Sequence, residues 1–271
     1  MAYTPPANDG GPVRRLLLLC SLAACTGTPI TQTLPPAPEE TTAAPAPPTD
    51  LLKEVVGAAD RHPDDRAKDV IRKPLELLRF GRLRPGQRVA EVGAAGGYTT
   101  ELLSRSVGAQ GKVYSQNPES WREWSVEPWN TRIGHHAMPN VTRVQLPMEA
   151  PLPDDASDLD AIFSVLIYHD VVNMPTDRAA MNAAIFAHLK PGGNYIVIDH
   201  QAAEGAGVTV TETLHRIERD TVEQEVLAAG FELVGGSTAW VHHEDAHDTL
   251  SVGDPQPVTD RYALKFRRPD L

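Results

Sequence analysis

The chain has 271 residues, with 36 acidic and 25 basic side chains, so its formal net charge at pH 7 is −11. This length is sufficient for one sizeable hydrophobic core with attached segments. The acidic balance argues against a nucleic-acid partner, because neutralisation of phosphates by Lys and Arg supplies most of that affinity. A small molecule is the expected ligand.

The N-terminal segment places a basic pair, Arg14 and Arg15, before a short apolar run, Leu16–Ala24, that ends at Cys25. A run of this length suits an export signal and is too short to span a bilayer. The letters LAAC at 22–25 resemble the bacterial lipobox. The resemblance implies a lipoprotein signal over 1–25, a lipidated Cys25, and attachment to the periplasmic side of the inner or outer membrane through lipid alone. A chance apolar run in a disordered N-terminus is the alternative.

Residues 26–49 are rich in Pro, Thr and Ala and lack apolar periodicity, which predicts a disordered tether between lipid and domain. The only cysteines are Cys20 and Cys25, so a mature chain would keep one, acylated, and we expect no disulfide or thiolate site.

From residue 50 on, helical and strand patterns alternate. Helices are expected at 51–60, 66–81 (interrupted by Pro74), 98–108, 175–193 and 219–230. Strands are expected at 87–92, 111–116, 141–146, 159–168, 194–199, 231–241 and 261–269. We therefore predict a helical segment over 50–84 and, over 85–271, an α/β domain with a doubly wound, mostly parallel sheet and helices on both faces. Such sheets bind ligands beyond the carboxyl ends of their strands.

The stretch VAEVGAAGGYTTELL, 89–103, reads as a strand, a glycine-rich turn and a helix. Glycines permit unusual backbone conformations and close approach, and the following helix presents free N–H groups. The dinucleotide pattern G-x-G-x-x-G is not met, because Ala95 and Tyr98 occupy two of its glycine positions, so NAD is disfavoured. A tight turn without a ligand is the structural alternative.

Three pieces of the sequence together resemble class I S-adenosylmethionine-dependent methyltransferases. They are EVGAAGG at 91–97, LPDDASDLDAIFSVLIYHD at 152–170 and AIFAHLKPGGNYIVIDH at 184–200. The resemblance covers roughly 85–267. A closer similarity is to a little-characterised branch of predicted exported methyltransferases that carry YHD, DH and LHR, here at 168–170, 199–200 and 214–216.

This resemblance implies a seven-stranded Rossmann-like methyltransferase sheet and S-adenosylmethionine as cofactor. The cofactor-binding positions it implies are Glu91, Gly93, Ala95, Gly96, Gly97, Tyr98, Asn117 and Glu149. Asn117 departs from the family pattern, which has an acid there for the ribose hydroxyls. An amide can accept and donate a hydrogen bond but lacks the charge-assisted strength of a carboxylate. Glu149 lies near the position that meets the adenine.

Polar residues follow the fourth and fifth predicted strands and the loop after them. These candidate catalytic residues are His169, Asp170, Asp199, His200, His215 and Arg216. Methyl transfer is an in-line displacement that needs a positioned nucleophile and a base. Either His169 or His200 can be that base, with Asp170 or Asp199 orienting the ring, and Arg216 can hold an anionic substrate group. A buried, purely structural histidine is the alternative for each ring.

A divalent metal is a further alternative, because Asp170, Asp199 and His200 resemble the metal positions of catechol-type methyltransferases. Such mixed ligation suits zinc, iron or manganese more than magnesium. The segment VHHEDAHD at 241–248 is a second candidate metal cluster or a solvated loop. The segment WREWSVEPWN at 121–130 is either an aromatic lid over a substrate or a helix docked on the core. His135 and His136 follow this segment, and each can point toward the site or away from it.

The predicted function is an exported, lipid-anchored methyltransferase acting on oxygen or nitrogen of a small molecule, with no protein partner. Two alternatives remain. One is a periplasmic small-ligand binding module that retains the fold without transfer chemistry, and the other is a metal-dependent enzyme of different chemistry on the same sheet.

Overall fold

The computed structural model describes residues 49–253 and 255–270. The predicted signal, the lipidated Cys25 and nearly all of the predicted tether lie outside these residues. The description therefore begins with the predicted helical segment and continues through the α/β domain.

A seven-stranded sheet forms the centre of the domain, with strand order β3-β2-β1-β4-β5-β7-β6. Only β7 runs antiparallel to its neighbours, β5 and β6. The strands are β1 (Arg88–Val92), β2 (Lys112–Asn117), β3 (Val141–Gln145), β4 (Leu159–Val165), β5 (Leu189–His200), β6 (Glu232–Ser237) and β7 (Arg261–Arg267). This confirms the predicted mostly parallel, doubly wound sheet.

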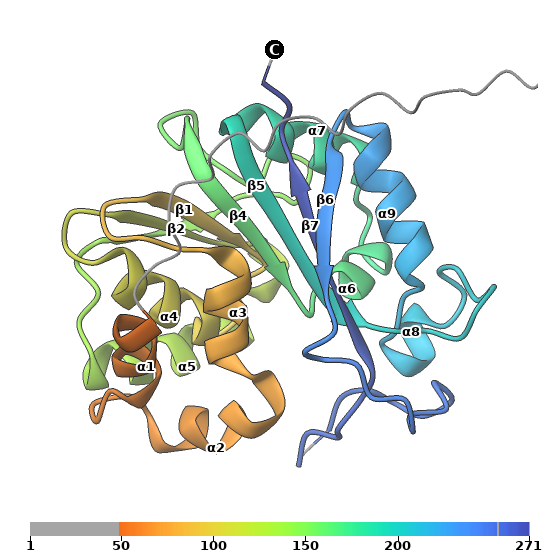
Figure 1. The fold of residues 1–271 in the computed structure, drawn as a ribbon, viewed down its shortest axis with the longest axis horizontal. Helices are drawn as coiled ribbons and strands as arrows, with labels where there is room; N and C mark the ends of the chain where they lie inside the picture. Colours follow the sequence, from red (N-terminus) through yellow and green to blue (C-terminus); the bar gives the residue numbers. More distant parts are fainter. Residues whose placement is uncertain (1–48, 254, 271) are drawn as a thin grey trace, which may run out of the picture. The chain divides into compact units, whose positions relative to one another are not determined.

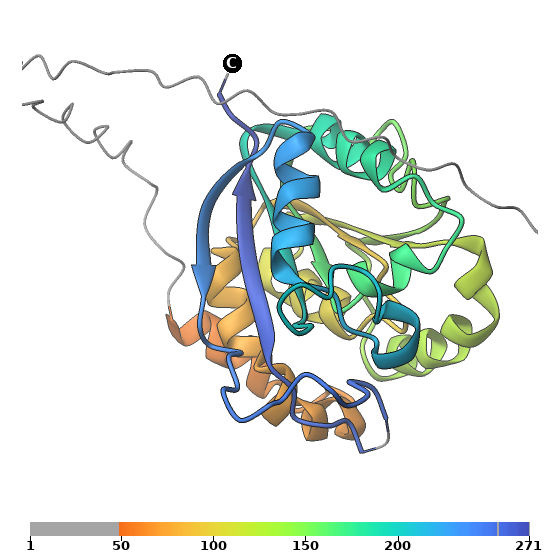
Figure 2. The same ribbon diagram turned by 90° about the vertical axis from the view of Figure 1, so that its right-hand side faces the viewer.

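Helices cover both faces of this sheet (Figure 1), and Figure 2 views it from the α9 side. They are α1 (Thr49–Gly57), α2 (Pro63–Arg72), α3 (Pro74–Gly81), α4 (Tyr98–Val107), α5 (Arg122–His135), α6 (Tyr168–Val172), α7 (Arg178–His188), α8 (Thr211–Leu214) and α9 (Arg219–Ala228), with a 3-10 turn, η1, at Glu119–Trp121. Among the described helices, none combines the length and apolar character needed to cross a bilayer.

The hydrophobic core has two parts, one on each face of the sheet. Helices α1, α3 and α4 contribute to one part, and α6, α7 and α9 contribute to the other. Successive residues of β4 alternate between them, because side chains of a strand point to opposite faces. Ile162 belongs to the part with α6, α7 and α9, and Phe163 to the part with α1, α3 and α4. Both are fully buried, which explains why β4 reads as one continuous apolar run.

Element boundaries differ from the prediction where the backbone turns sharply. The fourth strand ends at Val165, because Leu166 takes a left-handed conformation and Tyr168 starts α6. The YHD motif therefore lies on a helix. Helix α7 ends at His188, so residues 189–193, expected at the end of this helix, belong to β5 instead. The interruption at Pro74 is confirmed, since α2 and α3 meet at Lys73, just before that proline.

Candidate functional site

The glycine-rich turn between β1 and α4 is packed directly against α5. A Cβ on Gly97 would lie 2.2 Å from the ring of Trp129, and one on Gly96 would lie 2.8 Å from the side chain of Pro128. Gly97 also has a φ of +83° as the residue that precedes α4. Two glycines of the motif are therefore needed for the approach of a helix, in addition to any role toward a ligand.

The end of β2 braces the same turn. The amide nitrogen of Ala95 donates to Oδ1 of Asn117 at 2.7 Å, and Nδ2 of Asn117 donates to the Ala95 carbonyl at 2.9 Å. Gly93 donates to Oε1 of Gln116 at 3.0 Å. Both polar atoms of the Asn117 side chain thus pair with the backbone of one residue, Ala95, and Asn117 is 5% exposed. We expected Asn117 to face the ligand, but its amide instead fixes the left-handed Ala95.

A cavity of about 480 Å³ lies against the turn. Helix α2, the turn, α5 and the segment after β4 form its walls. Five of the predicted cofactor-binding residues line it: Glu91, Gly93, Ala95, Gly96 and Tyr98. Gly97 and Asn117 face other parts of the chain as described above. Glu149 lies apart from this cavity and accepts a hydrogen bond from the amide of Asp177 at 3.2 Å.

One acidic and one basic side chain, Glu91 and Arg72, line this cavity. Burial raises the pKa of Glu91 to about 7, although Thr100 donates a hydrogen bond to its carboxylate at 2.5 Å. Burial lowers the pKa of Arg72, whose guanidinium lies 4.8 Å from the centre of the Tyr98 ring. The Nε of Arg72 has no hydrogen-bond partner among the described residues. The cavity therefore offers complementary charges to a ligand that carries both signs.

Buried ion pairs fix the wall that α5 forms. Nη1 of Arg132 pairs with Asp65 of α2 and, at 2.7 Å, with Glu101 of α4, while its Nε donates to the carbonyl of Gly96 at 2.8 Å. One side chain thus ties three helices and the glycine turn together. Sequence analysis missed Arg72, Asp65 and Arg132, because no local motif marks residues that meet only through the tertiary fold.

A histidine–carboxylate cluster lies at the ends of β4 and β5. The fully buried Asp199 accepts from Nδ1 of His169 at 2.7 Å, from the His169 amide at 3.0 Å and from the His200 amide at 2.7 Å. Burial alone would lower the pKa of His169, but the carboxylates of Asp199 and Asp170 outweigh it, so this pKa is raised. Asp199 thereby fixes both the position and the orientation of the His169 ring.

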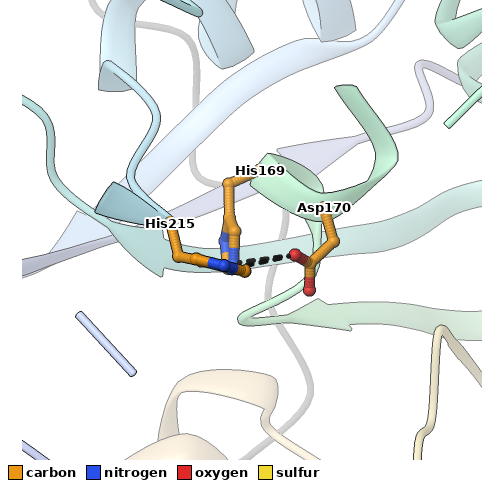
Figure 3. A group of neighbouring side chains, drawn as sticks. All are labelled: His169, Asp170 and His215. Carbon is orange, nitrogen blue, oxygen red and sulfur yellow. Dashed lines mark hydrogen bonds and ion pairs between the residues drawn. The ribbon is translucent and has the colours of Figure 1, made fainter. Parts of the chain in front are cut away.

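Asp170 and His215 complete this cluster (Figure 3). Oδ1 of Asp170 lies 3.4 Å from Nε2 of His169 and 3.2 Å from Nδ1 of His215. His169 and Asp170 come from α6, and His215 directly follows α8 in a left-handed conformation. The predicted convergence of residues after the fourth and fifth strands is thus seen for His169, Asp170, Asp199 and His215.

His200 and Arg216 have different surroundings from those predicted. The His200 ring is buried beside Thr259, 2.7 Å from its Oγ1, and burial together with Arg261 holds its pKa well below the ordinary value. Arg216 is fully buried and pairs with Asp245 at 2.8 Å. The Arg216 guanidinium therefore crosslinks two loops in this structure, and its role toward an anionic substrate stays a prediction.

The segments 241–248 and 121–130, which the sequence left open, contact other parts of the fold. In the 241–248 segment, Asp245 serves Arg216, and Nε2 of His247 lies 3.0 Å from Asp260. The 121–130 segment contains the last residue of η1 and most of α5. Trp129 is buried on the glycine turn, while Trp124 is 51% exposed. His135 contacts the ring of His62, and His136 pairs with Asp60, so both lie against the helical segment before β1.

The cavity and the cluster lie next to each other along the chain. Ile167 lines the cavity and is two residues before His169, so their Cα atoms are at most about 7 Å apart. Ile167 also contacts Gly93, because a Cβ on that glycine would lie 3.0 Å from its side chain. The glycine turn and the His169 cluster are therefore linked through one residue.

Solved structures with this fold are similar over most of the chain, whereas no model of a known protein family matches it. A S-adenosylmethionine-dependent methyltransferase from Aquifex aeolicus has a TM-score of 0.54 and 17% identity, covering 81% of this chain and 98% of that one. A putative methyltransferase from Bacillus halodurans has a TM-score of 0.52 and 19% identity, covering 72% and 98%. The [4+2]-cyclase SpnF has a TM-score of 0.51 and 17% identity, covering 82% and 92%. The described chain thus adopts the Rossmann-like methyltransferase fold.

Replacing Asn117 by Asp tests the bracing role of this side chain. The carboxylate can still accept from the Ala95 amide but faces the Ala95 carbonyl with no proton to donate. We expect the free energy of unfolding, measured in urea at pH 7, to fall by about 1–3 kcal/mol. Asn130→Asp, at an exposed position of α5, is the matched control and should change it by less than about 0.5 kcal/mol. An unchanged stability in Asn117→Asp would contradict this role.

The raised pKa of Glu91 predicts a pH-dependent stability. Between its ordinary value of 4.5 and its folded value of about 7, the folded protein binds a proton that the unfolded chain releases. The protonated Glu91 therefore stabilises the fold by about 3 kcal/mol below pH 4.5, and this stabilisation is lost as pH rises through 7. Compared with Glu91→Gln, the wild type should therefore lose stability between pH 5 and 8 in urea unfolding.

Glu123→Gln, at an exposed carboxyl of α5, serves as the control for this experiment. A stability difference between wild type and Glu91→Gln that stays constant with pH would show that Glu91 titrates at its ordinary pKa.

Proposed function

We propose that the chain is an S-adenosylmethionine-dependent methyltransferase that methylates an oxygen or nitrogen of a small molecule. The observation that carries this proposal is the cavity at the glycine turn, with Glu91 and Arg72 in it and the His169 cluster beside it. The position agrees with the rule that open α/β sheets bind ligands beyond the carboxyl ends of their strands.

The residues of the cavity fit the amino-acid end of S-adenosylmethionine. That end carries an ammonium and a carboxylate group. Glu91 supplies the acid that suits the ammonium, and Arg72, whose Nε has no partner among the described residues, suits the carboxylate. Gly93 lines the cavity without a side chain, and a Cβ there would lie 3.0 Å from Ile167. The bound cofactor would supply a methyl group on a sulfonium, which is an electrophile ready for displacement.

The acceptor has its place on the side of α6. Asp170 and His215 are each one-third exposed there, with the buried His169 behind them. An oxygen or nitrogen acceptor must lose a proton as it attacks, and this cluster is where the described chain can assist that loss. Asp199 keeps the His169 ring turned toward that side. The catalytic work of the protein is then largely to position two reactants in line.

A binding module without transfer activity is the second candidate, and one observation favours it. Asn117 stands where the resemblance places the ribose-binding acid, yet both polar atoms of its amide pair with Ala95. The solved structure of the [4+2]-cyclase SpnF, which is similar in fold, illustrates that a shared fold does not by itself decide the chemistry.

Cofactor binding is tested by calorimetry on the purified chain with S-adenosylmethionine and S-adenosylhomocysteine. We expect both to bind, and Arg72→Gln to weaken binding at least tenfold, because a charge-assisted hydrogen bond contributes about 1.5–3 kcal/mol. Arg79→Gln, at a surface arginine of α3, should bind like wild type. Absence of heat at millimolar cofactor would rule the methyltransferase out. Binding without S-adenosylhomocysteine formation from any of a panel of phenols, catechols and amines would favour the binding module.

We also propose that the chain is exported and held on a bacterial membrane by a lipid on Cys25, with Arg14, Arg15 and the LAAC segment as support. In membrane fractionation of the producing bacterium, wild type should sediment with membranes and Cys25→Ser should become extractable without detergent. A Cys25→Ser protein that stays in the membrane fraction would contradict lipidation.

A further inference from the structure

We propose that His169, Asp170 and His215 bind a divalent transition-metal ion, zinc or iron(II), at a site distinct from the cofactor cavity. The candidate ligand atoms of these three residues all lie within 4.8 Å of one another (Figure 3). Two imidazoles and one carboxylate are a donor set that zinc and iron(II) favour over magnesium or calcium. The inference concerns an ion that the proposed methyl transfer does not itself require.

The spacing of the ligand atoms matches the size of such an ion. A tetrahedral ion with bonds of about 2.0–2.1 Å separates its ligand atoms by roughly 3.3 Å. Oδ1 of Asp170 lies 3.4 Å from Nε2 of His169 and 3.2 Å from Nδ1 of His215. Two edges of the coordination polyhedron are thus already present. The third edge, between the two imidazole nitrogens, lies within 4.8 Å and would shorten on metal binding by a turn of the partly exposed His215.

The Nε2 atom of His169 gives independent support. His169 is 1% exposed, and among the described residues Nε2 has no hydrogen-bond partner even though it faces Asp170. A buried polar atom without a partner costs free energy, so a native protein usually provides one. A metal ion between His169, Asp170 and His215 would use the Nε2 lone pair and remove this cost.

Asp199 prepares His169 for this role. A carboxylate can only accept, so Nδ1 of His169 carries the proton and donates it to Asp199 at 2.7 Å. The tautomer that results leaves the Nε2 lone pair free on the side of Asp170. Metal-binding histidines commonly have such a carboxylate behind them, which orients the ring and increases its basicity. Asp199 is therefore a positioning residue for the proposed site.

The alternative set of Asp170, Asp199 and His200 is less suited to an ion. The Asp199 carboxylate already accepts three hydrogen bonds from His169 and His200, and Nδ1 of His200 lies beside Thr259. The proposed site, in contrast, has two ligands that are one-third exposed. Three protein ligands leave at least one position for water or an oxygen atom of a small molecule, as in metal sites that take part in reactions.

The test measures metal binding directly, without cofactor, on the full chain made without a histidine tag and freed of metal by a chelator. Isothermal titration with Zn²⁺, and anaerobically with Fe²⁺, should give one site per chain. Co²⁺ should give visible absorption bands of a four- or five-coordinate ion. His215→Ala should weaken Zn²⁺ binding at least 100-fold, and Asp199→Asn should weaken it about 10- to 100-fold.

His243→Ala, at an exposed histidine of the 241–248 segment, is the matched control and should bind Zn²⁺ like wild type. Circular dichroism checks the fold of each variant. The test uses His215→Ala because this ring is partly exposed, whereas loss of the buried His169 ring could unfold the protein. Zn²⁺ binding weaker than millimolar would overturn the proposal, as would equal affinity in wild type and His215→Ala. Neither result bears on calorimetry with S-adenosylmethionine.

Discussion

The buried carboxylate of Asp199 is the contact on which the site depends. Burying a charged group is costly unless hydrogen bonds compensate it, and this carboxylate accepts from the His169 ring, the His169 amide and the His200 amide. These bonds join the start of α6, after β4, to the end of β5. They follow from the sheet itself, since parallel neighbours bring the carboxyl ends of β4 and β5 to one edge. Asp199 thus fixes the His169 backbone amide and the direction of the His169 ring.

The glycine turn serves both the fold and the proposed ligand. Helix α5 packs so closely on Gly96 and Gly97 that larger residues have no room. The cavity is lined by Gly93, Ala95 and Gly96 of the same turn, together with Glu91. Asn117 fixes the turn by pairing with Ala95. This pairing needs an amide, which gives a structural reason for an Asn in place of the acid at this position. Helix α2, which precedes β1, lines the cavity, so the predicted helical segment is part of the site.

The sequence predicted the parts that depend on local patterns. Alternating helix and strand periodicities gave the sheet, and the sheet rule brought His169, Asp170, Asp199 and His215 to one place. Contacts between distant segments could not be predicted in this way. Arg216 pairs with Asp245 across 29 positions, and Arg72 reaches the cavity from a helix before the sheet. Neither contact leaves a periodicity or a motif. The sequence also could not show whether Asn117 contacts a ligand or braces the turn, because this depends on the left-handed conformation of Ala95.

The central claim is that the cavity at the glycine turn receives an adenosyl sulfonium whose methyl group points toward α6. A crystal structure of the chain with S-adenosylhomocysteine tests it most directly. The account predicts the amino-acid end between Glu91 and Arg72 and the sulfur atom beside Ile167, on the side of His169. A ligand bound elsewhere, or with its sulfur turned away from α6, would contradict the account.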